Sequence, residues 1–310
     1  MTNFTAPLYV SGAPVLPGGG LIRTGNWWFV DAATGSDGNP GTAQAPLASL
    51  AQAQINAVAN NGDVVVLLGT VHLTATLNWA KAGVSLIGQT APSNNCRARI
   101  SSTGATPFSP LVNVTASDCL FANIGTFHGG FTGATGAQVC WNDAGGRNGY
   151  INCQFLGGGD ATTAALAGMR SLTITGVGEN LFSDCTIGLD TIVRATNANA
   201  SLELKSGTAR NLFRSCIFQA ECSDASDNHV LIAAGGMDRY VLFDDCMFQN
   251  FGGTALNAAI ANAGGSPGGN VIVNNSISVG ATAIATTGNV FVNQISAAGA
   301  TTTGIGILAT

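Results

Sequence analysis

Hydrophobic and polar positions recur along this chain with a period of about 30 residues. The clearest copies centre on Cys153, Cys185, Cys216 and Cys246, which lie 32, 31 and 30 residues apart. A hydrophobic residue stands three positions before each of these cysteines, and another stands two positions after it. Residues two apart in a strand point to the same face, and no helical i, i+3, i+4 pattern recurs. The repeat therefore predicts short strands.

Two adjacent hydrophobic columns run through the repeat and extend beyond the cysteine copies. The position three before the cysteine holds an aromatic or β-branched residue in every copy: Phe121, Tyr150, Phe182, Phe213, Phe243, Val273 and Phe291. The position before that is leucine or isoleucine in most copies: Leu120, Leu181, Leu212, Leu242 and Ile272. Neighbouring residues in a strand face opposite sides, so one of these columns is expected to point outward.

Two polar columns accompany the hydrophobic ones. The position just before the cysteine carries short polar residues: Asn123, Asn152, Asp184, Ser215, Asp245, Asn275 and Asn293. Such residues tolerate left-handed backbone, so they predict a sharp corner between two strands. Six positions before the cysteine the charge alternates through Asp118, Arg147, Glu179 and Arg210. If the coils stack at about 4.8 Å, each charge lies beside an opposite one, and we expect this ladder to fix the register.

Repeats of short strands with polar corners indicate a solenoid. The sequence resembles a right-handed parallel β-helix of the pectate-lyase-like type, and the handedness follows from that resemblance. We therefore predict an all-β fold, a single-stranded right-handed parallel β-helix with coils of about 30 residues.

The chain divides into three predicted segments. Residues 1–26, rich in proline and glycine, are expected to form an extended N-terminal arm that anchors the rod. Residues 27–62 predict a strand, a glycine-rich turn and a capping helix, and residues 63–310 the β-helix, which tapers after residue 252 as aromatics become rare. The helix is expected to cover the open end of the solenoid.

The capping helix has its own sequence signals. Ser49 is a suitable N-cap, and Leu50, Ile55 and Val58, with Leu47 just before the cap, keep helical spacing. The residues Asn61 and Gly62 are expected to end the helix.

Composition narrows the function classes. Charged residues make up 9% of the 310 residues, the formal net charge is −5, and the mean hydropathy is +0.30. Such a chain is neither disordered nor equipped with the clustered Lys and Arg that nucleic acids need, so no nucleic-acid partner is predicted. The apolar runs are also far shorter than the ~20 residues of a spanning helix, so no membrane partner is predicted. The scarcity of charge favours an architectural role over an enzyme.

The cysteines and histidines predict no metal or cofactor site. No Cys-x-x-Cys pair occurs, and His72, His128 and His229 stand in unrelated parts of the chain. The cysteine column is instead expected to be a row of buried thiols that act as small apolar fillers.

Carboxylates are the remaining candidates for chemistry. Asp184 and Asp245 occupy the corner column two coils apart, which places them about 9.6 Å from each other, near the separation used by inverting glycosidases. Asp244 could join them, although Arg214 one coil below could neutralise it. Turn geometry alone also explains this column, so we assign no catalytic residue and expect no enzyme.

A second polar cluster is visible further along the chain. It consists of Asp224, Asp227 and His229, with Asp238 and Arg239 nearby in sequence. A solvated loop is the favoured interpretation.

The segment 27–42, the proline- and glycine-rich arm and the lack of a secretion signal resemble tailspike-like β-helical virion proteins of tailed bacteriophages. This resemblance implies a structural protein on the capsid surface of the virion, a decoration or stabilising protein held to the major capsid protein by residues 1–26. The outward apolar column predicts a homotrimer. The alternative is a tailspike-type receptor-binding protein or depolymerase that acts on a host-surface glycan. A bacterial surface adhesin is a third possibility.

Overall fold

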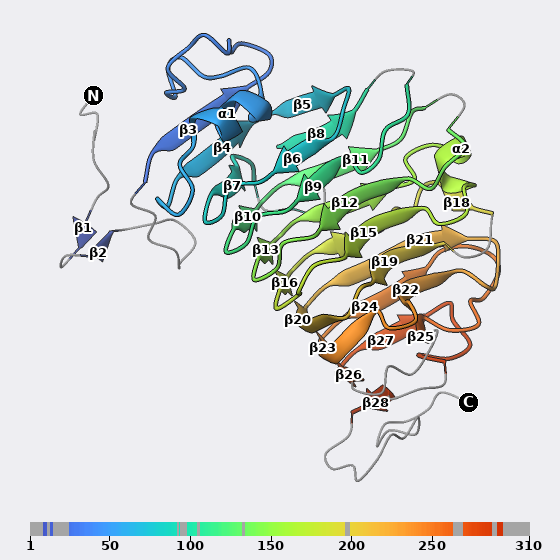
Figure 1. Ribbon diagram of the computed structural model, residues 1–310. Coiled ribbons are helices and arrows are strands. Elements are labelled where there is room, and N and C mark those ends of the chain that lie inside the picture. Colours follow the sequence, from blue (N-terminus) through green and yellow to red (C-terminus); the bar gives the residue numbers. More distant parts are fainter. Residues whose placement is uncertain are drawn as a thin grey trace.

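The structure is a computed structural model that describes residues 9–10, 13–14, 25–91, 93, 98–103, 106–131, 134–195, 199–262, 269–286 and 290–293. Three parallel sheets wind along one axis, from the blue N-terminal coils to the red C-terminal coils (Figure 1). The predicted right-handed parallel β-helix is confirmed. Each coil passes through sheets 1, 2 and 3 in turn and then enters the next coil.

The strands of each sheet follow the order of the coils. Sheet 1 contains β3 (Trp27–Asp31), β4 (Val64–Leu68), β7 (Ser85–Gly88), β10 (Leu120–Ala122), β13 (Gly149–Ile151), β16 (Leu181–Ser183), β20 (Thr208–Arg214), β23 (Met237–Asp244), β26 (Asn270–Asn274) and β28 (Val290–Val292). Sheet 2 contains β5 (Thr70–Leu73), β8 (Arg99–Ser102), β11 (Gly125–His128), β14 (Gln154–Gly157), β17 (Thr186–Ile187), β21 (Ile217–Cys222), β24 (Met247–Asn250) and β27 (Ile277–Val279), with β18 (Val193–Arg194) paired to β21. Sheet 3 contains β6 (Leu77–Trp79), β9 (Val112–Val114), β12 (Val139–Asp143), β15 (Arg170–Ile174), β19 (Ala200–Leu204), β22 (Asn228–Ile232) and β25 (Ile260–Asn262).

Four elements lie outside these stacks. The strands β1 (Tyr9–Val10) and β2 (Ala13–Pro14) form a short antiparallel pair within the expected arm. The helix α1 (Leu50–Asn56) contacts β3, β4 and β6 at the first coils, and α2 (Ala161–Ala164) lies between β14 and β15.

The aromatic column forms the centre of the core. Phe121, Tyr150, Phe182, Phe213 and Phe243 are fully buried, and successive rings stack with centroids 5.0, 4.5, 4.6 and 5.2 Å apart. This inward column leaves the Leu/Ile column on the outside of sheet 1, as the alternation of a strand requires.

The last coil departs from the predicted register by one residue. Val273 pairs with Val292, whereas the repeat had aligned Val273 with Phe291. Phe291 instead continues the outward column next to Ile272. The final copy is shortened, with one residue fewer between the inward position and its corner residue Asn293, so the pattern alone placed the aromatic on the wrong face.

The thiol column is confirmed. All seven described cysteines are free and buried. The thiols of Cys185, Cys216 and Cys246 each lie 3.5 Å from a carbonyl oxygen one coil back, namely that of Tyr150, Phe182 and Phe213. These weak donors fill small interior spaces beside the rings.

The corner between sheets 1 and 2 is confirmed in all seven copies. Every residue of the predicted corner column has a φ between 47° and 56°. The charged column proves to be a second corner, between sheets 3 and 1, because Asp118, Arg147, Glu179 and Arg210 have φ values of 60°, 54°, 60° and 50°. The alternation of charge predicted a register role for this column but not its left-handed backbone.

The capping helix is confirmed, but it ends earlier than predicted, and only part of its apolar spacing is buried. The Ser49 hydroxyl accepts a hydrogen bond from the Gln52 N–H at 3.1 Å, as an N-cap does. Leu50 is buried, whereas Ile55 is 67% exposed, and Val58 lies beyond the helix and is exposed as well. The helix ends at Asn56, before Asn61, because Ala57 is already extended.

Candidate functional site

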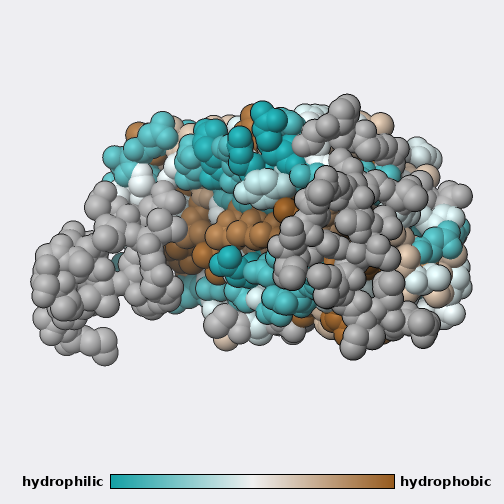
Figure 2. All heavy atoms as spheres, turned by 90° about the horizontal axis from the view of Figure 1, so that it is seen from below, coloured by the Kyte–Doolittle hydropathy of each residue, from teal (hydrophilic) through white to brown (hydrophobic). Residues whose placement is uncertain are grey.

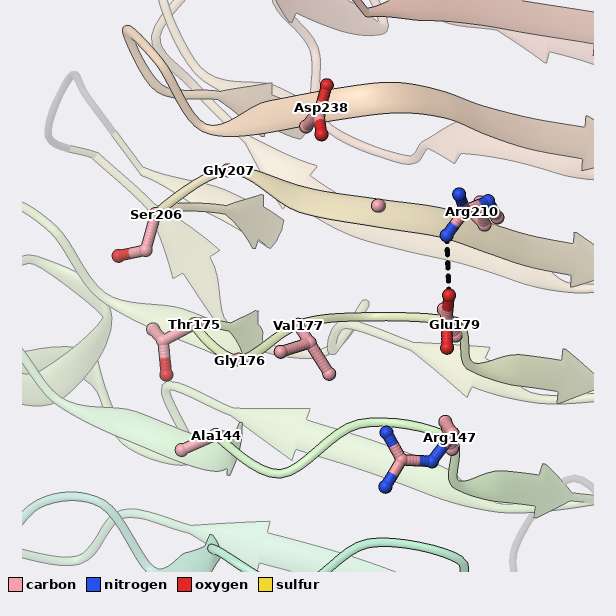
Figure 3. Close-up of a pocket in the computed structure, with 11 residues that line it drawn as sticks. Ala144, Arg147, Thr175, Gly176, Val177, Glu179, Ser206, Gly207, Arg210 and Asp238 are labelled. Carbon is pink, nitrogen blue, oxygen red and sulfur yellow. Dashed lines mark hydrogen bonds and ion pairs between the residues drawn. The ribbon is translucent and has the colours of Figure 1, made fainter.

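A groove of about 610 Å³ runs over the corners that join sheet 3 to sheet 1. Its charged lining residues are Arg147, Glu179, Arg210 and Asp238, which come from four consecutive coils. The rest of the lining is small, hydroxylic or aliphatic: Ala144, Thr175, Gly176, Val177, Ser206, Gly207 and Ala209. Figure 3 shows Glu179 and Arg210 facing each other, with Asp238 on the coil beyond Arg210.

Backbone hydrogen bonds hold the corners of the groove in register. The Arg147 N–H donates to the Gly178 carbonyl at 2.7 Å, and the Glu179 N–H donates to the Ala209 carbonyl at 2.6 Å. Ala209 in turn pairs with Asp238. Arg147, Glu179 and Arg210 are therefore presented to the groove at successive strand spacings of about 4.8 Å, whereas Asp238 on the fourth coil stands one residue earlier in the register.

Ion pairs link the charged side chains in twos. Arg147 Nε lies 3.1 Å from Asp118 Oδ1, and Arg210 Nη1 lies 2.5 Å from Glu179 Oε1. All four side chains are between 37% and 54% exposed. The predicted ladder of opposite charges is thus present. The hydrogen bond from Arg147 is the main reason that the pKa of Asp118 lies below its ordinary value.

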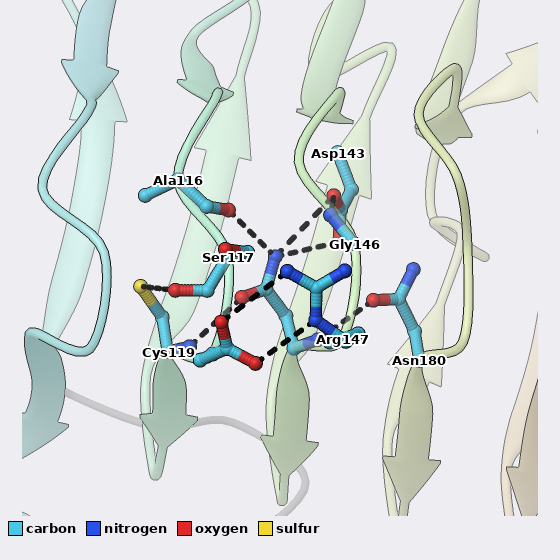
Figure 4. Close-up of polar contacts among 9 residues, drawn as sticks. Ala116, Ser117, Cys119, Asp143, Gly146, Arg147 and Asn180 are labelled. Atoms are coloured by element: carbon cyan, nitrogen blue, oxygen red, sulfur yellow. Dashed lines mark hydrogen bonds and ion pairs between the residues drawn. The ribbon is translucent and has the colours of Figure 1, made fainter.

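A buried polar network fixes the Arg147 corner from inside. Asp143 accepts hydrogen bonds from the N–H groups of Gly145 and Gly146, both at 3.0 Å, and from the Tyr150 hydroxyl at 2.8 Å. The side chain of Asn148 donates to the Ala116 carbonyl and to Asp143 (Figure 4). Burial raises the pKa of Asp143 despite these donors.

An asparagine ladder that sequence analysis missed lies beside this network. The Asn148 N–H donates to the Asn180 side-chain oxygen, and the Asn180 side chain donates to that of Asn211. All three residues are buried and stand five positions before a cysteine of the repeat. A column of identical polar residues in the repeat could have revealed the ladder.

The first predicted carboxylate pair lies at the other corner, away from the groove. Asp184 and Asp245 are exposed, with Ser215 between them in the column. Asp184 accepts from the Ser183 hydroxyl at 2.7 Å, and Asp245 accepts from the Ser215 hydroxyl at 3.2 Å. The neutralisation expected for Asp244 is present, because Arg214 Nε lies 3.8 Å from it.

The second predicted cluster is divided by the fold, and the expectation of one solvated loop is wrong. Asp238 lines the groove at the corner after β22. Asp227 and His229 are fully buried and lie at the start of β22, near the turn from β21. Asp224 starts that turn and is partly exposed. Residues close in sequence were separated because one strand, β22, carries the chain between the two corners.

Asp227 and His229 share their buried site with Arg194 and Cys222. Arg194 pairs with Cys222 across β18 and β21, and its Nη2 donates to the Ser201 hydroxyl at 3.2 Å. Asp227 Oδ1 accepts from the Asn199 N–H at 3.2 Å. Within the described residues Arg194 Nη1, Asp227 Oδ2 and both ring nitrogens of His229 have no hydrogen-bond partner.

This grouping of Cys, His and Asp does not form an activated nucleophile. Burial raises the pKa of the Cys222 thiol to about 12, and burial together with the Arg194 cation lowers the pKa of His229 to about 3. A thiol that stays protonated beside a histidine that stays neutral lacks the thiolate that nucleophilic catalysis needs. The cluster therefore bears on the stability of the fold and not on nucleophilic catalysis.

The described part of the chain contains no group of three His, Cys, Asp or Glu side chains arranged to hold a metal ion. No helix among its residues is both long enough and apolar enough to cross a membrane.

Comparisons with known proteins give the fold. No family model and no curated protein matches the sequence. Among solved structures, the chain is similar to a rhamnogalacturonan lyase (TM-score 0.57, 16% identity, 86% of this chain and 73% of that one). It is also similar to the pectate lyase Pel9A (TM-score 0.60, 16% identity, 87% and 68%) and to a pectin methylesterase from Aspergillus niger (TM-score 0.51, 17% identity, 93% and 92%). At these identities the likeness shows a shared parallel β-helix.

These neighbours correct the expectation that the chain is not an enzyme. All three are enzymes on the same fold, so that expectation is contradicted. It rested on the scarcity of charge, and a β-helix needs few charges for its fold because its coils are held by backbone ladders and buried rings. A catalytic site requires only two or three carboxylates, so a low overall charge does not exclude one.

Proposed function

We propose that this chain is a polysaccharide-acting β-helix protein that binds an extended glycan along the groove and hydrolyses it. The observation that carries the proposal is the charged corner column. An Arg or Glu in left-handed backbone costs about 1–2 kcal/mol. An exposed ion pair between two such residues contributes only about 0–1 kcal/mol. Stability therefore does not account for Arg147, Glu179 and Arg210 at these corners, which face a groove.

The geometry of the groove supports a glycan as ligand. Its side chains repeat at about 4.8 Å along the rod, close to the length of one pyranose in an extended chain. Guanidinium donors and carboxylate acceptors alternate there, and both bind sugar hydroxyls strongly. The similar structures, which are lyases and an esterase of pectic polysaccharides, support a glycan partner for this fold.

Glu179 and Asp238 are the proposed carboxylates for hydrolysis. They stand two coils apart, with Asp238 in register with Gly178 and so one residue out of line with Glu179. Two strand spacings and this one-residue offset place their backbones about 10 Å apart, and the side chains can bring the carboxyl groups to the ~6.5–9.5 Å of inverting glycosidases. One carboxyl group would protonate the glycosidic oxygen while the other activates a water molecule on the opposite face of the sugar. The guanidinium of Arg210, between them, would hold the sugar at the cleavage point.

We expect Glu179→Gln and Asp238→Asn each to lower glycan cleavage at least 100-fold, because each removes a proton-transfer group. The measurement is the release of reducing ends from mixed-linkage β-glucan, galactomannan and polygalacturonate. Asp184→Asn and Asp245→Asn are matched controls and should keep wild-type rates. Loss of cleavage in the controls, with the groove variants unaffected, would move the active site to the other corner.

A second proposal concerns assembly and location. We propose that the chain forms a homotrimer in a bacteriophage virion, as a tailspike-type receptor-binding protein or a capsid decoration protein held to the major capsid protein by residues 1–26. The support is the outward column of sheet 1, where Leu120, Leu181, Leu212, Leu242 and Ile272 are aligned and only partly covered. Figure 2 shows hydrophobic residues gathered in a band along the side seen from below, between hydrophilic borders. Such a band on a rod is typical of a protein interface.

We expect Leu181→Asp combined with Leu242→Asp to convert a trimer into a folded monomer, since two charges would be buried in the interface. Native mass spectrometry at micromolar concentration measures the change, with circular dichroism as the check on folding. Ile277→Asp, an equally drastic change at an exposed position of sheet 2, should leave the trimer intact. A wild-type chain that is monomeric under these conditions contradicts the proposal.

A further inference from the structure

We infer that the groove selects an uncharged glycan and discriminates against polyuronates. This inference rests on the proposed function and adds the substrate class to it. It also sets the chain apart from the pectic polysaccharides in the names of its structural neighbours, which carry carboxylates.

The first reason is that each described cation bordering the groove already has a carboxylate partner. Arg147 is paired with Asp118 through two of its nitrogens, and Arg210 is paired with Glu179. Arg239 Nη1 lies 3.4 Å from Oδ1 of the groove residue Asp238, its neighbour in sequence. The charge of each arginine is therefore already balanced by a protein carboxylate, so a uronate carboxylate meets a neutral ion pair and gains little Coulomb attraction there.

The second reason is the charge around the groove. The lining itself holds two guanidinium and two carboxylate groups, which cancel, and the whole chain carries a formal net charge of −5. A polyanion approaching the rod meets no attractive field, so its association is not steered by charge. An uncharged glycan is not repelled by the net negative charge of the protein.

The third reason is that the remaining surface suits neutral sugars. Val177 is 56% exposed in the groove, an aliphatic side chain against which the C–H face of a pyranose can pack. Thr175 stands two residues before Val177 on the same coil, and Ser206 lies on the next coil, so both add hydroxyl groups to the lining. The paired side chains retain unused hydrogen-bond donors and acceptors, because a guanidinium has five N–H donors and a carboxylate has about four acceptor sites. Alternating donors and acceptors match the hydroxyl groups of a neutral glycan.

Glu179 is the specificity-determining residue on this account. It supplies an acceptor for sugar hydroxyls and at the same time neutralises Arg210. Glu179→Gln removes the negative charge, retains the side-chain size and leaves Arg210 without its counter-charge. The variant should therefore lose affinity for neutral glycans and gain affinity for polyuronates, a change of opposite sign for the two classes.

The test is affinity electrophoresis of the full chain in gels that contain one soluble polysaccharide each: mixed-linkage β-glucan, galactomannan, polygalacturonate or alginate. We expect the wild-type chain to bind at least one neutral glycan at least 10-fold more tightly than either polyuronate. In Glu179→Gln the neutral glycan should bind about 10-fold more weakly, a loss near 1.4 kcal/mol, and the polyuronates several-fold more tightly at low salt. Asp184→Asn, which also removes one negative charge, is the control for net charge and should leave both affinities unchanged.

The outcomes separate the inference from the proposed function. Wild-type binding of a polyuronate at least as tight as that of both neutral glycans overturns the inference and leaves glycan binding in place. Equal gains for polyuronates in Glu179→Gln and Asp184→Asn also overturn it, because net charge would then explain the change. Binding of none of the four polysaccharides overturns the proposed function itself.

Discussion

Replacing Phe182 by alanine should lower the free energy of unfolding by about 3–5 kcal/mol. Phe182 is fully buried, and its ring stacks on Tyr150 at 4.5 Å and on Phe213 at 4.6 Å. Alanine would break the column in the middle and leave a cavity that the stacked coils cannot close, because backbone ladders fix their spacing. A urea titration followed by circular dichroism measures the effect as a lower midpoint with an unchanged slope.

Phe251→Ala is the matched control for this prediction. It deletes the same atoms from a side chain that is 56% exposed, so its expected cost is less than about 1 kcal/mol. Equal losses in Phe182→Ala and Phe251→Ala would show that the aromatic column is not what stabilises the rod.

Replacing Arg194 by methionine should destabilise the protein by about 3 kcal/mol at pH 8 and much less at pH 5. The guanidinium is buried near Asp227, and methionine keeps most of the apolar stem while removing the charge. Asp227 would then be a buried carboxylate whose favourable cation is gone. Adding Asp227→Asn to Arg194→Met should recover much of the loss at pH 8, because it removes the isolated charge.

The direction of the pH effect follows from Asp227. Burial raises its pKa to about 6 in the folded chain, although the Asn199 N–H and the Arg194 cation lower it, and its unfolded value is about 3.9. The folded state therefore binds more protons between these two values, and this group's contribution to stability falls as the pH rises through that window. Without Arg194 the folded pKa rises further, and the penalty extends to higher pH.

Urea midpoints at pH 5 and pH 8 measure these effects. Arg147→Met serves as the control, since Arg147 is exposed and its pair with Asp118 is worth about 0–1 kcal/mol at either pH. A loss in Arg194→Met that is equal at both pH values, and that Asp227→Asn does not relieve, contradicts the electrostatic account.

The repeat pattern predicted the fold because every coil of a β-helix solves the same local problem. The column of Phe182 had to be buried and the column of Asp184 had to turn, and both requirements are visible in sequence. The same logic failed at the last coil, where a one-residue shortening moved Phe291 to the outer face. Helical spacing alone left the side of the short helix that meets the rod undetermined, and Ile55 is exposed.

Only part of the candidate site could be predicted from the sequence. The charge column that forms the groove was recognised, but as a register device, because the sequence does not show that the corner backbone is left-handed or that loops beside it leave a hollow. Asp238 and Asp227 looked like neighbours in one loop, yet β22 separates them. Arg194 and Cys222, 28 residues apart, gave no signal of contact because they meet outside the repeat.

The sequence by itself determined the strands, the corners, the stacked rings and the thiol column, since these depend on contacts that recur at one fixed period. Only the tertiary structure decided where charged corners open into a groove and which polar groups are buried together. Those features depend on loops of unequal length between the strands, whose paths are set by what they pack against and not by the repeat.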